Sequence, residues 1–436
     1  MEYTIPKIAE ARKKKPTAII VAGGSGPALR YQFYLDNAEI DMVILAEGEY
    51  PLLDLCEEKN WRDIEGVVFK NKAKVLSAED YWDISKGIDF ESMAIDRCWK
   101  KTAALYDDPD YNEINTVRLF TSNYCPMGCK FCTLTLWKKN ASGRTIPVVG
   151  LSVEQIVDMI KQVVKCYKDV RQIFFVDDDF FLLRARGIDF CNRVIEEKSK
   201  GGLPEQLKFI SMSNINRLDE ENIKLIAAAG FRVLSVGVES TSQYVLDSYN
   251  KKQSPKQIWK ITELLLKYGI KPYYTAIMFS PEGRINDLIM DLEGFRKLAK
   301  MGVGLSVEPY LIPLPGTPFW EEQIPQSSRW VSIGQGGRIK KGFAWLPIDE
   351  EARVVFDMFE EWYPKYRKKR FDVDGVGHKE KNYQAGIILD AVEIVLRYIG
   401  YNDFSGRFGH SEAKRIYMQV DKIEKVDVDI VGDFVM

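Results

Sequence analysis

Three cysteines lie close together in one short segment of the 436-residue chain. Cys125, Cys129 and Cys132 follow a C-x3-C-x2-C spacing, and Gly128 allows the tight backbone turn that can point the three sulfurs at one centre. Three thiolates on one loop can ligate three irons of a [4Fe–4S] cube and leave the fourth iron open to a small molecule. Phe131, between the last two cysteines, would cover one side of such a cluster.

A zinc site is the alternative interpretation of these cysteines, because structural zinc usually takes four nitrogen or sulfur ligands. The other four cysteines are scattered along the chain without a second C-x2-C pair, and the two histidines, His378 and His410, lie far downstream. A disulfide framework is not typical of a chain of this length with seven scattered cysteines. The spacing therefore favours an iron–sulfur cluster and leaves zinc open.

The composition excludes several classes of protein. A formal net charge of −2 with 28% charged residues gives no support to nucleic-acid binding. No apolar run approaches the ~18 residues of a membrane span, and the N-terminus lacks the basic start and apolar core of a signal peptide. These features predict a cytoplasmic protein whose length allows two or three domains.

Apolar runs alternate with amphipathic stretches from about residue 116 to 310, which is typical of βα units on a parallel sheet. Six units in series predict an α/β fold, a partial (βα)6 TIM-like barrel, with ligands at the carboxyl ends of the strands. We expect strands at 117–121, 172–176, 208–212, 233–238, 271–279 and 305–310, and helices from about 152 and at 184–199, 219–229, 254–267 and 285–300.

The remaining regions have different patterns. Residues 1–75 are expected to form a small α/β domain, and residues 76–115, with many charges and few apolar runs, a linker. The barrel would occupy residues 116–324. Apolar residues at helical spacing predict a mainly helical C-terminal region over 325–436.

Polar or small residues stand at the expected carboxyl ends of three strands. Asp177 and Asp178 follow the second strand, Ser213 follows the third, and Gly237 and Glu239 end the fourth. Carboxylates there can accept hydrogen bonds from an ammonium group or from ribose hydroxyls, and glycine lets a ligand approach the backbone. Aspartates can also cap a helix, so the shared position of these residues is stronger evidence than any single motif.

The cysteine segment resembles that of the radical S-adenosylmethionine (SAM) superfamily. The resemblance implies that the open iron binds SAM and that an electron from the cluster cleaves SAM to a 5′-deoxyadenosyl radical. Residues 177–180 are similar to the Asp-Asp-x-Phe pattern of the cobalamin-linked branch, which implies contact with the amino group of SAM. Residues 237–240 resemble a Gly-x-Glu-Ser segment that contacts its ribose, Ile277 would pack on the adenine, and 314–318 resembles a Pro-Gly-Thr-Pro element of the same branch.

The N-terminal domain carries a second resemblance. Gly23-Gly24 after one strand and Glu47-Gly48-Glu49 after the next look like the second half of a cobalamin-binding, flavodoxin-like domain. The first half, whose histidine ligates cobalt, has no counterpart, and residues 1–75 contain no histidine. Cobalamin is a possible further cofactor by this resemblance, but we expect the truncated domain to cap the barrel without holding cobalamin tightly.

These features together predict a radical SAM enzyme that modifies an unknown small molecule at an unactivated C–H bond by methylation, cyclisation or rearrangement. A reductant such as flavodoxin or ferredoxin would supply the electron, and neither nucleic acid nor a membrane span is expected. A non-catalytic zinc- or cluster-stabilised binding protein is the alternative from a different class. That alternative leaves the strand-end carboxylates without a role.

Overall fold

The computed structural model describes most of the chain. Only the backbone is described for residues 4, 72–73, 321–323, 328–335, 338–343, 371–374 and 383, and side chains are described for the rest of the residues given below. Most of the expected linker lies outside the described residues, as does Pro315 of the Pro-Gly-Thr-Pro element. The described residues are 4–45, 47–70, 72–73, 87–99, 115–135, 137, 139, 147–312, 314, 316–323, 328–335, 338–374 and 383–422.

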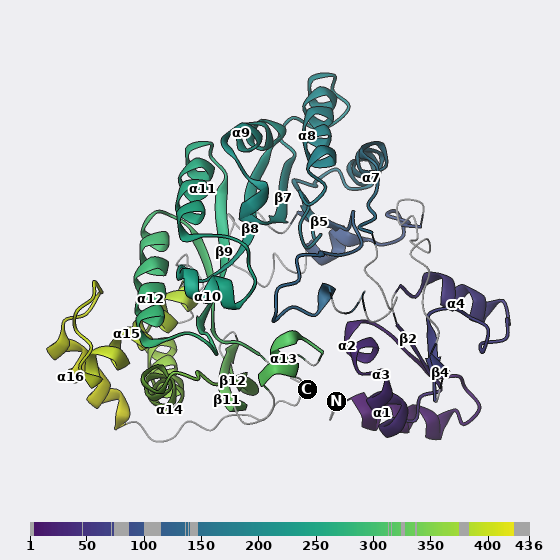
Figure 1. The fold of residues 1–436 in the computed structure, drawn as a ribbon. Coiled ribbons are helices and arrows are strands. Elements are labelled where there is room, and N and C mark those ends of the chain that lie inside the picture. Colours follow the sequence, from purple (N-terminus) through teal and green to yellow (C-terminus); the bar gives the residue numbers. More distant parts are fainter. Residues whose placement is uncertain are drawn as a thin grey trace.

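A six-stranded sheet forms the centre of the molecule (Figure 1). Its strand order is β10-β9-β8-β7-β6-β5, and every neighbouring pair is parallel. The prediction of a partial (βα)6 barrel is therefore confirmed. The strands are β5 (Thr116–Leu119), β6 (Gln172–Phe175), β7 (Lys208–Ser213), β8 (Phe231–Glu239), β9 (Lys271–Phe279) and β10 (Gly304–Tyr310).

Helices connect these strands and cover the outer face of the sheet (Figure 1). Their ends follow local sequence signals, because Ser152, Asp219 and Ser254 each form a capping box and Gly230 ends its helix at φ 109°. The helices are α7 (Val153–Cys166), α8 (Arg184–Ser199), α9 (Glu220–Ala229), α11 (Pro255–Lys267) and α12 (Ile285–Lys300), with the short α10 (Gln243–Ser248) and η2 (Ile215–Arg217) between them.

The core lies between the sheet and these helices. Phe175 on β6 stacks on Phe180 with ring centroids 4.3 Å apart and meets Phe190 of α8 edge-on at 5.3 Å. Phe209 and Phe231, on β7 and β8, join the same cluster at 5.3 Å from each other. Burying five such rings removes a large apolar area from water, and this fixes the first strands against their helices.

The N-terminal unit is a separate small sheet with order β1-β2-β3-β4. Its first pair is parallel and the other two pairs are antiparallel. Trp137, just beyond the cysteine segment, packs against its core and donates from Nε1 to the carbonyl oxygen of Leu45. The elements are α1 (Thr4–Lys14), β1 (Val21–Ala22), α2 (Ser25–Leu29), α3 (Tyr31–Asn37), β2 (Met42–Ile44), α4 (Glu49–Cys56), β3 (Val67–Phe69) and β4 (Lys72–Ala73).

The C-terminal region is mainly helical but begins with an antiparallel hairpin that the sequence interpretation did not include. Phe356 and Phe359 of the first long helix pack on Phe279 and Tyr310, at the ends of β9 and β10. Among the described residues, no helix is long and apolar enough to cross a membrane. The elements are α13 (Pro318–Gln323), β11 (Ser328–Gln335), β12 (Arg338–Trp345), α14 (Glu350–Asp374), α15 (Tyr383–Ile399) and α16 (His410–Asp421).

Candidate functional site

The three cysteines lie on the loop that follows β5, at the carboxyl end of the sheet. The loop is held by its own hydrogen bonds, because Thr135 Oγ1 donates to Cys125 O at 2.9 Å and accepts from Gly128 N at 3.2 Å. Cys132 N donates to Cys129 O at 3.0 Å. Gly128 has φ +70°, a conformation that favours glycine. The sequence therefore builds a compact turn around the three thiols.

All three thiols are partly buried, and burial raises the pKa of each, that of Cys125 to about 12. The charge of Cys129 also raises the pKa of the other two, so the thiols lie within electrostatic reach of one another. Within the described residues, no three Cys, His, Asp or Glu side chains converge as ligands of a single ion do. A [4Fe–4S] cube does not require this convergence, because each thiolate ligates a different iron. The positive charge of the irons favours the thiolate form of the cysteines.

The cysteine loop also contacts the end of α10. Lys130 N donates to Tyr249 O at 3.1 Å, and Asn250 Nδ2 donates to Gly128 O at 2.9 Å. Phe131 meets the Tyr249 ring edge-on at 5.2 Å and packs against a buried cluster that includes Ile277. The structure thus brings together Phe131 and Ile277, two residues predicted to flank the cluster and the adenine.

Asp177 has no exposed surface. Its carboxylate accepts from Thr121 N at 3.2 and 3.1 Å, from Thr121 Oγ1 at 2.8 Å and from Ser122 Oγ. Burial raises the pKa of Asp177, and these hydrogen bonds oppose the rise. The side chain therefore ties the end of β6 to the start of the cysteine loop, and contact with SAM stays a prediction for this residue.

The next two aspartates differ in their surroundings. Asp178 is half-buried and accepts a hydrogen bond from Cys125 N, and its pKa is raised by burial and by the charge of Asp177. Asp179 is buried 3.4 Å from Arg217 Nε, and burial raises its pKa to about 6. Asp178 is therefore the member of the triplet that lies beside the thiols and retains exposed surface.

Arg217, which the sequence interpretation did not single out, links the cysteine loop to the strand after it. Its Nη2 lies 3.5 Å from the Met127 sulfur, on the loop, while its Nε faces Asp179. Ser213 ends β7 nearby in the sheet, and its buried hydroxyl has no hydrogen-bond partner within the described structure. A buried hydroxyl without a partner at a strand end is available to a ligand.

Glu239 and Lys251 form a buried ion pair beside the cysteines. Lys251 Nζ lies 3.3 Å from Glu239 Oε1, and Thr275 Oγ1 on β9 donates to the same carboxylate at 3.3 and 3.2 Å. Burial lowers the pKa of Lys251, but Glu239 and the thiols of Cys129 and Cys125 outweigh this effect and raise it. The lysine thus holds positive charge between Glu239 and the expected cluster.

The backbone around Glu239 is specialised for this pair. Glu239 has φ +66°, which is uncommon for a residue other than glycine, and the pairing of β8 with β9 shifts register there. A Cβ atom on Gly237 would lie 2.5 Å from Glu239 Oε1 and 2.8 Å from Lys251 Nζ. A side chain at position 237 would therefore force the Glu239 carboxylate or the Lys251 ammonium group to shift.

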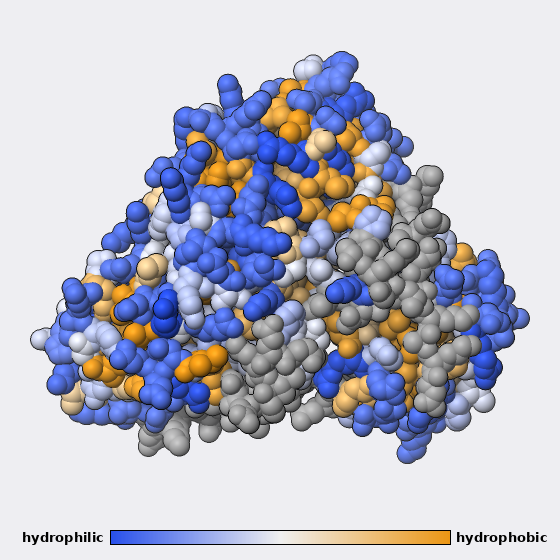
Figure 2. All heavy atoms as spheres, in the orientation of Figure 1, coloured by the Kyte–Doolittle hydropathy of each residue, from blue (hydrophilic) through white to orange (hydrophobic). Residues whose placement is uncertain are grey.

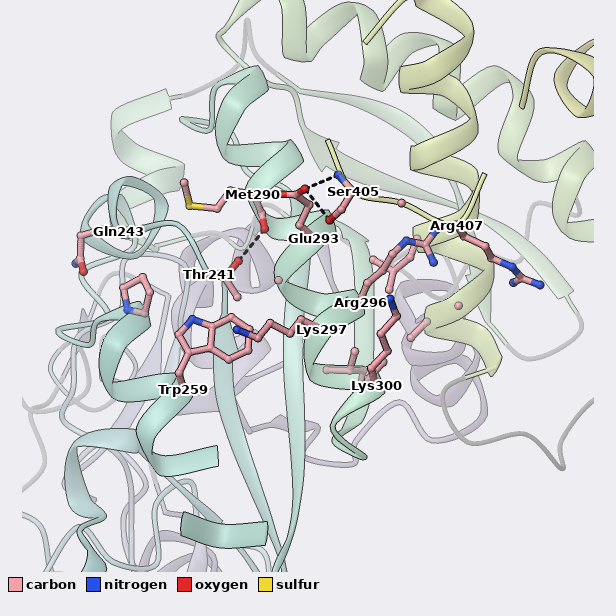
Figure 3. A pocket seen from close by; sticks show the side chains of 18 residues that line it. Thr241, Gln243, Trp259, Met290, Glu293, Arg296, Lys297, Lys300, Ser405 and Arg407 are labelled. Atoms are coloured by element: carbon pink, nitrogen blue, oxygen red, sulfur yellow. Dashed lines mark hydrogen bonds between the residues drawn. The ribbon is translucent and has the colours of Figure 1, made fainter. Parts of the chain in front are cut away.

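The loop after Glu239 is fastened to α12. Ser240 Oγ donates to the Asp291 carboxylate at 2.9 and 2.7 Å. Thr241 Oγ1 donates to Met290 O at 3.2 Å, and Figure 3 shows this second bond. Burial raises the pKa of Asp291 to about 7. Ser240 of the Gly-x-Glu-Ser segment is therefore an anchor for the loop, whereas Glu239 faces the cysteines.

A family model of the radical SAM superfamily matches residues 119–303, which span the cysteine loop and most of the barrel. The segment that the model matches is therefore a radical SAM domain. The radical SAM family implies a [4Fe–4S] cluster and SAM as cofactors.

Curated relatives of the chain include methyltransferases and a cyclase. The chain is 24% identical over 341 residues to an uncharacterized methyltransferase of Pyrococcus horikoshii, a match that spans 74% of this chain and 66% of that protein. It is 26% identical over 331 residues to the anaerobic magnesium-protoporphyrin IX monomethyl ester cyclase of Cereibacter sphaeroides, across 70% of this chain and 48% of the cyclase. The matches thus cover under two thirds of either relative.

Solved structures share the fold of the chain, including its N-terminal unit. The cobalamin-dependent radical SAM enzyme OxsB, with aqua-cobalamin and SAM bound, has a TM-score of 0.63 and 17% identity, covering 100% of this chain and 67% of OxsB. The methyltransferase TsrM of Kitasatospora setae has a TM-score of 0.57 and 15% identity, covering 95% and 85%. At such identities the likeness establishes the fold alone.

Proposed function

We propose that this radical SAM enzyme abstracts hydrogen from an unactivated C–H bond of a small molecule, with Cys125, Cys129 and Cys132 holding the cluster. The observation that carries the proposal is the buried Glu239–Lys251 pair beside the cysteine loop, at the carboxyl edge of a partial barrel. A non-catalytic zinc site would give this pair no role. When bound, the cluster and SAM supply an electron and a 5′-deoxyadenosyl radical.

The side chains of this site divide the task of holding SAM. Glu239 would accept the ribose hydroxyls through the carboxylate that folds back over Gly237. Asp178 would accept from the amino group, and the free hydroxyl of Ser213 would bind a polar group of the cofactor. Phe131 and Ile277 would supply the apolar walls that exclude water from the reacting atoms.

Anaerobic reconstitution tests the cluster and the reaction together. We expect about four irons per chain, and release of 5′-deoxyadenosine and methionine from SAM when dithionite is added. Cys129→Ala should lose the iron and the brown chromophore. Cys166→Ala is the matched control, because Cys166 is an exposed cysteine outside the loop and should retain both. Stoichiometric zinc without iron absorption would instead support the zinc-stabilised binding protein.

Methyl transfer with cobalamin is a finer alternative within the same family. A flavodoxin-like cobalamin domain would enclose the corrinoid with a fully parallel sheet, whereas only one of the three strand pairs in the described N-terminal sheet is parallel. We therefore expect hydroxocobalamin to separate from the protein on gel filtration after equilibrium dialysis. Co-elution near one corrinoid per chain would contradict this expectation and favour methylation over cyclisation or rearrangement.

A further inference from the structure

The sheet has a second face, opposite the one that the helices cover. Val117 and Leu119 of β5 are buried under the helices, whereas Arg118 between them is exposed on the opposite side. The strand register carries this alternation across the sheet, since Arg118 pairs with Phe174 and Thr275 pairs with Ser306. We call this side the inner face, and define it by Arg118, Phe174, Ile210, Met212, Ser235, Tyr273, Thr275, Ser306 and Glu308.

The inner face exposes large apolar side chains. Met212 is 38% exposed and Tyr273 is 39% exposed, and Phe120, which continues the alternation beyond β5, is 45% exposed. Figure 2 shows hydrophobic side chains around β5 and β7, while hydrophilic ones dominate over the outer helices. Large apolar residues gathered on one side of a sheet, below the expected SAM site, are typical of a ligand-binding surface.

Two residues of opposite charge, Arg118 and Glu308, lie on the two outermost strands of the sheet. Each is within three residues of the carboxyl end of its strand. Arg118 on β5 lies 5.6 Å from the centre of the Phe174 ring, and it makes no ion pair or hydrogen bond within the described part of the chain. Glu308 on β10 likewise has no such partner there, and burial raises its pKa although its side chain reaches solvent. Lys208 and Lys271 share this face but begin their strands, at the amino edge.

An arginine that rests on an aromatic ring without a carboxylate partner presents its guanidinium to an anion from solution. Glu308, five strands away, repels an anion and attracts a donor such as an amine or a hydroxyl. We propose that the substrate carries an anionic group that pairs with Arg118 and an apolar body that lies on Phe174, Met212 and Tyr273, with its other end toward Glu308. This inference rests on the proposed function, because it names the substrate class of the same site.

An outer groove is the rival binding place for such a molecule. It has a volume of about 930 Å³ and includes Trp259, with Lys297 Nζ 4.4 Å from the centre of its ring. Figure 3 shows that this groove lies along α11 and α12, with Lys300 and Arg407 on its far side. It contains none of the inner-face residues, so substitutions can separate the two places.

Two fluorescent probes test the inference on the reconstituted enzyme. 8-Anilinonaphthalene-1-sulfonate is an anion with an apolar aromatic body, and N-phenyl-1-naphthylamine has the same rings without the sulfonate. We expect Arg118→Met to weaken binding of the anion at least ten-fold and to change binding of the neutral probe less than two-fold. Glu308→Gln should tighten the anion two- to five-fold. Lys297→Met, the matched control in the outer groove, should leave both probes unchanged.

Several results would overturn the inference. These are unchanged anion binding in Arg118→Met, equal loss of both probes in that variant, loss of the anion in Lys297→Met, or no saturable binding of the anion to the wild type. An unchanged affinity in Glu308→Gln would overturn the orienting role of Glu308. Neither probe is turned over, so the outcome is independent of iron content and of 5′-deoxyadenosine release, and a failure here is distinguishable from a failure of the proposed function.

Discussion

Lys251→Met is the perturbation that most directly examines the site, because it removes the positive charge between Glu239 and the cysteines. The pair is separated by 3.3 Å, and its two side chains are 7% and 10% exposed. At an effective dielectric constant of about 20, charges at that distance attract by about 5 kcal/mol before desolvation is subtracted. Leaving one member of a buried pair without its partner typically costs about 3–5 kcal/mol.

A double-mutant cycle with Glu239→Gln measures this coupling. Each single substitution leaves a buried charge without its partner, whereas the double variant leaves none. We therefore expect the double variant to be about 1–3 kcal/mol more stable than the sum of the two single changes in unfolding free energy predicts. The assay is urea unfolding of cluster-free protein, monitored by circular dichroism. Because the protein carries no cluster, loss of metal does not contribute to the unfolding equilibrium. Lys252→Met is the control, since Lys252 is the exposed neighbour and should change stability by less than about 0.5 kcal/mol.

Additive effects within about 0.5 kcal/mol would refute the reasoning, because independent sites add to that precision. The same variants have a second measurement, the dissociation constant for SAM in the reconstituted enzyme. Glu239→Gln should weaken SAM by about 1–3 kcal/mol, the usual loss when a buried hydrogen bond to a charged group is removed. Normal affinity would show that Glu239 does not accept the ribose hydroxyls.

Two further predictions concern the supports of this pair. Gly237→Ala places a Cβ 2.5 Å from Glu239 Oε1, so equilibrium dialysis should show SAM affinity lowered at least ten-fold, whereas Gly386→Ala, where a Cβ would meet nothing within 4 Å, should not change it. Burial raises the pKa of Asp291 from 3.8 to about 7, so the folded state holds this proton more tightly than the unfolded state, and stability should fall as pH rises from about 4 to about 7. Asp291→Asn removes this titration, so between pH 5 and pH 8 the variant should lose about 3 kcal/mol less stability than the wild type. Equal losses would contradict the assignment.

The barrel was predictable because its signals are local. Strand Lys271–Phe279 and helix Arg184–Ser199 have the expected bounds, and Ser152 caps its helix as the sequence indicated. The hairpin over 328–345 was missed although it had a signal, since glycines at 334, 336 and 337 separate two runs that contain β-branched and aromatic residues. The division of the chain into four regions stays a prediction.

The residue types of the proposed site could be read from the sequence, but their contacts within the fold could not. Lys251 is one of two adjacent lysines, and only tertiary packing distinguishes it, since it is 5% exposed and lies against Glu239 while Lys252 faces solvent. Arg217 lies in the segment after β7, whereas Met127 and Asp179 follow β5 and β6. The sequence around Arg217 does not indicate that its side chain reaches both residues. Long-range contacts of this kind depend on the order and register of strands, which sequence periodicity does not encode.

One part of the division of roles does follow from strand geometry. Side chains alternate between the two faces of a strand, so Asp177 continues the parity of the buried Phe175 and lies on the side that the helices cover, where it fastens the cysteine loop. Asp178 has the opposite parity and keeps exposed surface beside Cys125.

The end of β8 repeats this pairing of an anchor with a site-facing carboxylate, because Ser240 is fastened to Asp291 while Glu239 turns toward the cysteines. The two kinds of residue differ in what a substitution should change first. Loss of Asp177 or Ser240 removes a contact that the protein makes with itself, so its first effect is on the stability of the loops. Loss of Asp178 or Glu239 would remove a group that we propose binds the cofactor, so its first effect should be on affinity.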